Sequence, residues 1–105
     1  MLTLLLTGML TLAFNFQPAK PEPTTIIVPD DYPTIQAAIN AANDGDTVFV
    51  RNGTYYENVV VNKPVSLVGE DKQTTNIDGN NTGYCARIQS NGVVLENFHR
   101  KRKFG

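Results

Sequence analysis

Residues 28–50 read VPDDYPTIQAAINAANDGDTVFV. Within residues 34–42 apolar side chains recur at i, i+3, i+4 and i+7, which gives one apolar stripe. A β-branched run, residues 24–28, precedes this segment, and a second β-rich run, residues 47–50, follows it. The pattern predicts a strand, a short helix that covers an apolar surface, and another strand. We expect this helical cap to be built by Pro33, Ile35, Ala38, Ile39 and Ala42.

Acidic pairs flank the predicted helix. Asp30 and Asp31 precede it, and Asp44 and Asp46 follow it on either side of a glycine. Capping and turn roles are the expected ones for carboxylates in these places. A calcium loop of the EF-hand type is excluded, because the further ligands and the closing Glu are absent.

Beyond Asp46 the sequence consists of short β-rich runs separated by Gly, Asn, Asp or Pro. We expect strands at residues 47–50, 58–61, 65–68, 75–77, 84–88 and 93–98. Because no second helical pattern occurs, alternating βαβ units are excluded. A β-sandwich, a small barrel and a β-solenoid remain.

The spacing of the apolar strand centres favours the solenoid. They recur in two interleaved series, with spacings of 17 and 17 residues in one and of 19 and 21 in the other. The first series is Val60, Ile77 and Val94, and the second is Val48, Leu67 and Ile88. Similar periods predict a repeating coil in which each strand stacks on its counterpart one turn later.

The ordered motifs at residues 28–42, 45–50, 53–59 and 63–70 resemble the N-terminal portion of right-handed parallel β-helix proteins of the pectin lyase-like superfamily. They are most similar to exported prokaryotic β-helix proteins, including those grouped with the periplasmic copper-binding accessory protein of nitrous oxide reductase. A looser similarity extends to the opening of pectin methylesterases. The resemblance implies an all-β, right-handed parallel β-helix of about three coils, with one short capping α-helix over the N-terminal end of its apolar column.

The chain opens with the uncharged apolar run MLTLLLTGMLTLAF, residues 1–14. This run is shorter than the ~20 residues of a membrane span and suits a secretory signal, although a basic first segment is missing and a core helix is the alternative. We predict a signal peptide at residues 1–16, a Pro-rich linker at 17–23 and the β-helix at 24–98. The protein is therefore expected to be secreted, at the cell surface or periplasmic, with no stable membrane span after signal cleavage.

The net charge of -1 conceals an acidic domain with a basic tail. Four of the nine Lys and Arg lie in residues 100–103, so residues 1–98 carry five basic and ten acidic side chains. The tail, residues 99–105, interrupts the repeat after Phe98, and a truncated or frame-shifted reading frame would explain this change. Because the basic residues lack interleaved aromatics, no nucleic-acid partner is expected. We expect self-association through an open C-terminal end of the column.

The strongest surface candidate is the run Tyr55, Tyr56 and Glu57. Adjacent aromatic residues in a strand point to opposite faces, so one ring could stack on a sugar. In the alternative reading, one Tyr lies inward and the other covers a turn. Asn52 and Asn80 begin glycosylation sequons.

No catalytic or metal residue is predicted. In proteins with the fold that this chain resembles, active sites generally lie several coils beyond the cap. The resemblance therefore assigns no catalytic residue to this chain. Cys85 is expected to be a small buried side chain, and His99 has no accompanying ligands for copper or zinc. No cofactor is predicted, although a longer parent of the lyase type would use calcium.

These observations favour an exported β-helix fragment that acts as a structural or carbohydrate-binding surface module without its own catalytic site. Its expected partner is a polysaccharide or cell-surface glycan. One alternative is the N-terminal fragment of a polysaccharide-active enzyme of the pectate lyase or pectinesterase type. Another, a periplasmic copper-delivery accessory protein, rests on the resemblance alone.

Overall fold

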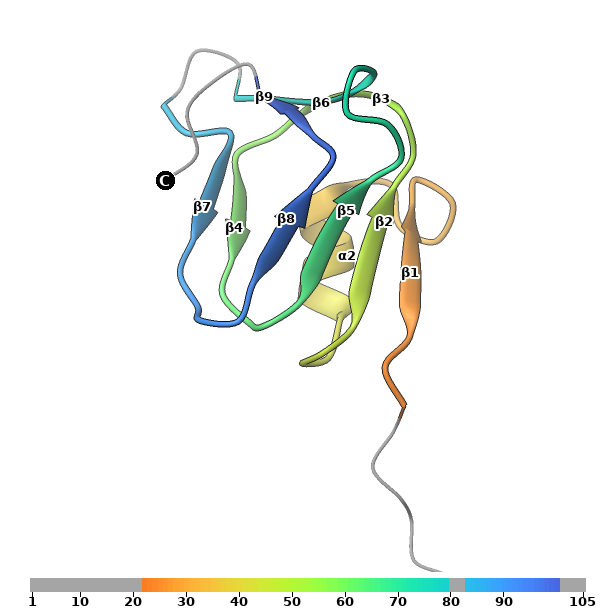
Figure 1. Ribbon diagram of the computed structural model, residues 1–105, viewed down its shortest axis with the longest axis vertical. Coiled ribbons are helices and arrows are strands. Elements are labelled where there is room, and N and C mark those ends of the chain that lie inside the picture. Colours follow the sequence, from red (N-terminus) through yellow and green to blue (C-terminus); the bar gives the residue numbers. More distant parts are fainter. Residues whose placement is uncertain (1–21, 80–82, 101–105) are drawn as a thin grey trace, which may run out of the picture.

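The structure is a computed structural model that describes residues 22–79 and 83–100. Within these ranges the chain forms one short helix and three sheets in which all strands run parallel (Figure 1). The elements are β1 (Thr25–Val28), α2 (Ile35–Ala41), β2 (Thr47–Val50), β3 (Gly53–Tyr56), β4 (Val59–Val61), β5 (Ser66–Gly69), β6 (Thr75–Asp78), β7 (Ala86–Ile88), β8 (Val94–Glu96) and β9 (His99–Arg100). The predicted signal peptide, Asn80 and residues 101–105 lie outside the described residues.

The chain visits the three sheets in turn, and each strand pairs with its counterpart one turn later. The strand orders are β1-β2-β5-β8, β3-β6-β9 and β4-β7. In the first sheet Ile26 lies beside Val48, Val48 beside Leu67, and Leu67 beside Leu95. This arrangement is a small parallel β-solenoid, which confirms the predicted fold class.

The stacking register differs from the predicted one. Val60, Ile77 and Val94 do not stack on one another, because they lie in β4, β6 and β8, which belong to three different sheets. In the second predicted series the pair of Val48 and Leu67 is correct, but Ile88 pairs with Val61. The first sheet repeats after 22, 19 and 28 residues. Turns of unequal length, rather than a constant period, therefore set the register.

Two strands lie outside the predicted runs. β3 begins at Gly53, between the predicted strands at residues 47–50 and 58–61, and it pairs with β6. β9 pairs with β6 through Asn76 and His99, so the coil continues two residues beyond Phe98, where we expected the repeat to end.

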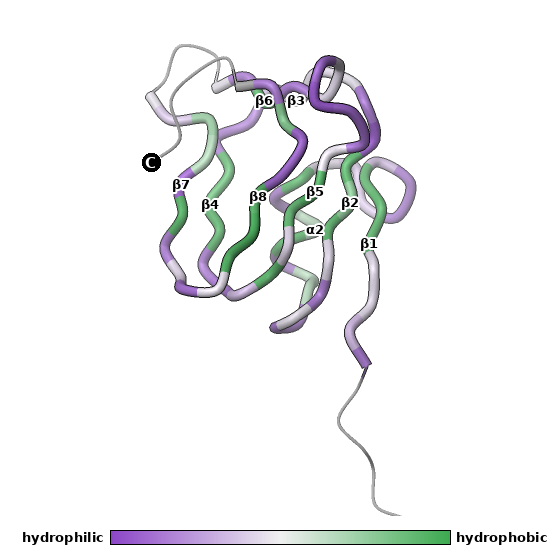
Figure 2. The backbone as a smooth tube through the Cα atoms, viewed as in Figure 1, coloured by the Kyte–Doolittle hydropathy of each residue, from purple (hydrophilic) through white to green (hydrophobic). Residues whose placement is uncertain are grey.

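The inward side chains form an apolar column. Residues along the strands alternate between buried and more exposed, as in β2 and β5, and Figure 2 shows the hydrophobic stretches concentrated on the strands. The column contains Val28, Val48, Val50, Val59, Val61, Val65, Leu67, Ile77, Cys85, Ala86 and Phe98. The one buried hydroxyl among these strands, that of Thr75, accepts a hydrogen bond from the N–H of Asp71 at 3.0 Å.

Helix α2 covers the column as predicted. Ile35, Ala38 and Ile39 are fully buried, Ala42 is 4% exposed, and the helix contacts β1, β2 and β4. In Figure 1 it lies beside β4, in the place that a strand occupies in the later coils. Pro33 takes no part in this packing, because it is exposed.

The helix begins differently from the prediction. Its N-cap is Thr34, whose hydroxyl accepts the N–H of Ala37, rather than the acidic pair before it. Asp30 instead forms an ion pair with Arg51 at 3.0 Å, which raises the pKa of that guanidinium. Asp31 accepts the N–H of Ile27 at 2.8 Å, and its own N–H donates back to the Ile27 carbonyl. The two aspartates thus hold the chain around β1.

No helix in the described part of the chain is long and apolar enough to cross a membrane.

Candidate functional site

The structure separates the three residues of the predicted sugar-binding run. Tyr55 is half-buried, and its hydroxyl donates to the Arg51 carbonyl at 2.8 Å. Burial, together with nearby carboxylates, raises the pKa of Tyr55. Glu57 accepts the N–H groups of Ile35 and Gln36 at 2.9 and 3.0 Å. Only Tyr56, which is 68% exposed, offers its ring to solvent.

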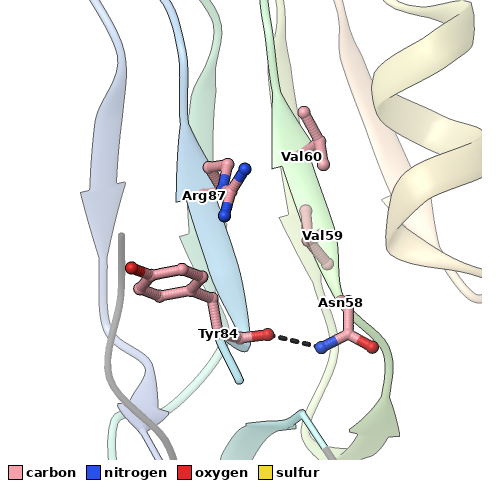
Figure 3. Close-up of a pocket in the computed structure, with 5 residues that line it drawn as sticks. All are labelled: Asn58, Val59, Val60, Tyr84 and Arg87. Atoms are coloured by element: carbon pink, nitrogen blue, oxygen red, sulfur yellow. Dashed lines mark hydrogen bonds between the residues drawn. The ribbon is translucent and has the colours of Figure 1, made fainter. Parts of the chain in front are cut away.

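A shallow pocket of about 170 Å³ lies beside this run, on the face of the β4–β7 sheet. Figure 3 shows its lining: Asn58, Val59, Val60, Tyr84 and Arg87. The Arg87 guanidinium carbon lies 4.9 Å from the centroid of the Tyr84 ring, within the range of a cation–π contact. The pocket therefore has an aromatic wall, a cationic group and a valine floor.

Parallel pairing and one asparagine build this pocket. Arg87 lies in register beside Val60, which places the guanidinium over the sheet face. The side-chain amide of Asn58 donates to the carbonyl of Tyr84, as drawn in Figure 3, and to the carbonyl of Gly79 at 3.4 Å. A side chain at Gly79 would meet the Tyr84 carbonyl oxygen at 3.0 Å. The segment that carries Tyr84 is thus packed tightly against the preceding coil.

Both exposed tyrosines belong to the same corner of the solenoid. Tyr56 ends β3 immediately before the chain turns into β4, and Tyr84 precedes β7 one coil later. The large apolar or aromatic side chains that are exposed in the described residues are Tyr56, Tyr84 and Val94. We call Tyr56, Tyr84 and Arg87 the tyrosine corner.

The tyrosine corner combines exposed aromatic rings with a cationic hydrogen-bond donor. A ring with a free face can stack on a pyranose, and a guanidinium can donate hydrogen bonds to hydroxyl or carboxylate oxygens. Its pocket is smaller than the ~300–1,000 Å³ usual for enclosed ligand sites, so it would contact part of an extended chain rather than enclose a small molecule.

The sequence pattern indicates Tyr56 as a surface candidate but not Tyr84 or Arg87. Tyr84 and Arg87 fall inside one expected strand, residues 84–88, whereas β7 begins at Ala86. Their neighbours Asn58 and Val60 come from a coil 26 and 27 residues earlier. An aromatic residue just ahead of a strand, with a basic residue on that strand, is the sequence signal that was available.

The remaining candidates lie elsewhere. Asn52 is exposed at the corner between β2 and β3, and its N–H donates to Glu70 at 2.9 Å. Cys85 is fully buried, as predicted. His99 is exposed, and residues 22–79 and 83–100 contain no group of three or more His, Cys, Asp or Glu placed to hold a metal ion.

In comparisons with protein-family models, with curated proteins and with solved structures, nothing matches this chain. The interpretation of the tyrosine corner therefore rests on its geometry.

Proposed function

We propose that this chain is the first part of an exported parallel β-helix of the pectin lyase-like type, and that it acts as a structural or carbohydrate-binding surface module. The pairing of every strand in parallel with its counterpart one coil later supports the β-helix assignment. The proposed location, which is secreted, at the cell surface or periplasmic, rests on the predicted signal peptide at residues 1–16, whose apolar run covers residues 1–14.

The observation that carries the binding role is the tyrosine corner. Tyr56 and Tyr84 are 68% and 39% exposed, and Arg87 lies over the second ring. Exposed aromatic rings beside a hydrogen-bond donor suit a ligand with apolar faces and many hydroxyl groups. A polysaccharide or cell-surface glycan has this chemistry.

A role without catalysis fits the lining of the pocket. Its five residues include no carboxylate. Glycoside hydrolysis generally requires two carboxyl groups on either side of the scissile bond. The nearest acidic side chain along the chain, that of Glu57, is engaged by the two helix N–H groups.

The test is binding of the purified chain to a panel of soluble neutral and acidic polysaccharides, measured by affinity electrophoresis and calorimetry. Tyr84→Ala removes the ring and the cation–π contact, so affinity should fall about tenfold. Tyr56→Ala should weaken binding to long chains more than to short oligosaccharides. Val94→Ala, an exposed apolar residue on β8, is the matched control and should leave affinity unchanged.

Three results would count against the proposal. They are a lack of binding to every polysaccharide in the panel, equal affinities of Tyr84→Ala and the control, and cleavage of pectin by the purified chain. The last result would identify the chain as part of a polysaccharide-active enzyme.

A further inference from the structure

The sequence contains two Asn-Gly pairs at turns, Asn52-Gly53 and Asn91-Gly92. In such a pair the glycine backbone nitrogen can attack the side-chain amide carbon of asparagine, because no Cβ crowds the approach. The attack requires that the glycine N–H is not held by another acceptor and that the local backbone can move. The two pairs differ in the first respect.

Asn52-Gly53 is fixed by the sheet. The N–H of Gly53 donates to the Thr74 carbonyl at 2.9 Å, and the N–H of Asn52 donates to Glu70 at 2.9 Å. Gly53 is also the first residue of β3 and lies in register beside Thr75. Its nitrogen becomes available only when β3 separates from β6, which requires local unfolding.

Asn91-Gly92 lies in the turn between β7 and β8, and both residues are exposed. Within residues 22–79 and 83–100, neither the Asn91 side-chain amide nor the Gly92 N–H makes a hydrogen bond, although the Asn91 carbonyl accepts the Ser90 hydroxyl. Gly92 has φ +78°, in the region that glycine adopts without strain. No hydrogen bond in the described structure therefore has to break before this nitrogen can react.

We propose that Asn91 is a site of spontaneous deamidation and that the fold protects Asn52 from the same reaction. The Gly92 nitrogen loses its proton and forms a bond to the Asn91 side-chain carbon. The bond from that carbon to the amide nitrogen breaks, and the nitrogen leaves as ammonia with the proton. Water then opens the resulting succinimide at either carbonyl and gives Asp or isoaspartate, without any oxidation or reduction.

The modification changes a turn that is closely packed on the preceding coil. A Cβ at Gly92 would lie 3.2 Å from Cβ of Pro64. Each product adds one negative charge, and isoaspartate also lengthens the main chain ahead of β8. We therefore expect the isoaspartate product to disturb the pairing of Val94 with Ser66.

The experiment is incubation of the purified chain at mildly alkaline pH, followed by peptide mass mapping with fragmentation that separates Asp from isoaspartate. Asn91 should convert about tenfold faster than Asn52, or more, since the second reaction needs β3 to open. In a denaturing concentration of urea the two sites should convert at similar rates. This second arm shows whether the difference comes from the fold, and it does not depend on any carbohydrate-binding role.

Equal rates in the folded chain would overturn the proposal, as would faster conversion at Asn52. A rate difference that persists unchanged in urea would also overturn it, because local sequence and not the fold would then be its cause.

Discussion

The side chain of Gln36 makes the two hydrogen bonds with Val60 that a neighbouring strand would make. Its amide oxygen accepts the Val60 N–H at 2.7 Å, and its amide nitrogen donates to the Val60 carbonyl at 3.0 Å. Val60 lies in β4, the first strand of its sheet, so these groups would otherwise form an open edge. Helix α2 thus closes the sheet with one side chain.

The substitution Gln36→Leu should show how much these two hydrogen bonds stabilise the folded chain. It keeps the bulk of the side chain but leaves the partly buried N–H and carbonyl of Val60 without partners. We expect the free energy of unfolding to fall by about 1–3 kcal/mol. The measurement is urea unfolding with the m-value compared between variants. Asn40→Ala, which removes only the exposed contact with the Gln36 amide at 3.1 Å, should cost well under half as much.

Glu57 is predicted to stabilise the helix rather than to bind a ligand. Its two carboxylate oxygens accept N–H groups from the first turn of α2, where the helix dipole favours negative charge. Glu57→Ala should therefore lower the free energy of unfolding by about 1.5–3 kcal/mol. Glu96→Ala, at an exposed position in β8, is the control and should change stability little. Equal changes in the free energy of unfolding for the two substitutions would show that Glu57 does not stabilise the helix.

Asp46 should make stability depend on pH in the acid range. Its carboxylate accepts the N–H groups of Thr24 and Asn43, each at 2.9 Å, and these hydrogen bonds hold its pKa below the ordinary value of 3.8. Since the folded state has the lower pKa, the stabilising contribution is complete above the unfolded pKa and is lost as the pH falls through the folded pKa.

The difference in unfolding free energy between the wild type and Asp46→Asn should therefore be constant near neutral pH and should shrink below the unfolded pKa near 3.8. Asp44→Asn changes an exposed neighbour and provides the matched control. A difference that stays constant down to the lowest pH at which the chain folds would show that the carboxylate charge contributes nothing.

Ile39 tests the packing of the helix on the column. This side chain is fully buried, so Ile39→Asp should place a charge in an apolar site and cost several kcal/mol. Asn40→Asp puts the same charge on the exposed face of the same helix and should be tolerated. Helical and β signals in circular dichroism, followed through thermal unfolding, provide the measurement. Similar melting temperatures for both variants would contradict the packing of α2 on the apolar column.

The last coil that the structure describes should make the chain associate with itself. Ile88 and Leu95 are only half-buried, whereas their partners one coil earlier, Val61 and Leu67, are fully buried, and Val94 is 40% exposed. Apolar residues and strand edges of this kind favour pairing with another chain. We expect the sedimentation coefficient and melting temperature to rise with protein concentration. A monomer whose thermal transition is independent of concentration would rule out this association.

Local sequence patterns were sufficient for some of the elements, although they missed β3 and β9. The β-rich run at residues 47–50 gave the limits of β2 correctly, and the stripe at Ile35, Ala38 and Ile39 gave the buried face of α2. Both signals depend on side chains within one or two turns of the chain, so no knowledge of distant partners is required.

The register could not be predicted in the same way. The turns contain different numbers of residues, so the strands do not recur at a constant spacing. A constant spacing wrongly predicted that Val60, Ile77 and Val94 stack on one another, whereas they lie in three separate sheets. The apolar residues at the centres of different strands look alike in the sequence. Only the path of the chain around each coil decides which strands lie side by side.

Local residue patterns are enough to define the fold class: short strands, one amphipathic helix, and polar turns that allow a coil. The partners that give the coil its specific form are set by contacts between residues far apart in the chain. Gln36 reaches Val60 across 24 residues, Glu57 reaches Ile35 across 22, and Asn58 reaches Tyr84 across 26. The physical reason is that periodicity is a local property, whereas the distance between residues on successive coils depends on every turn between them.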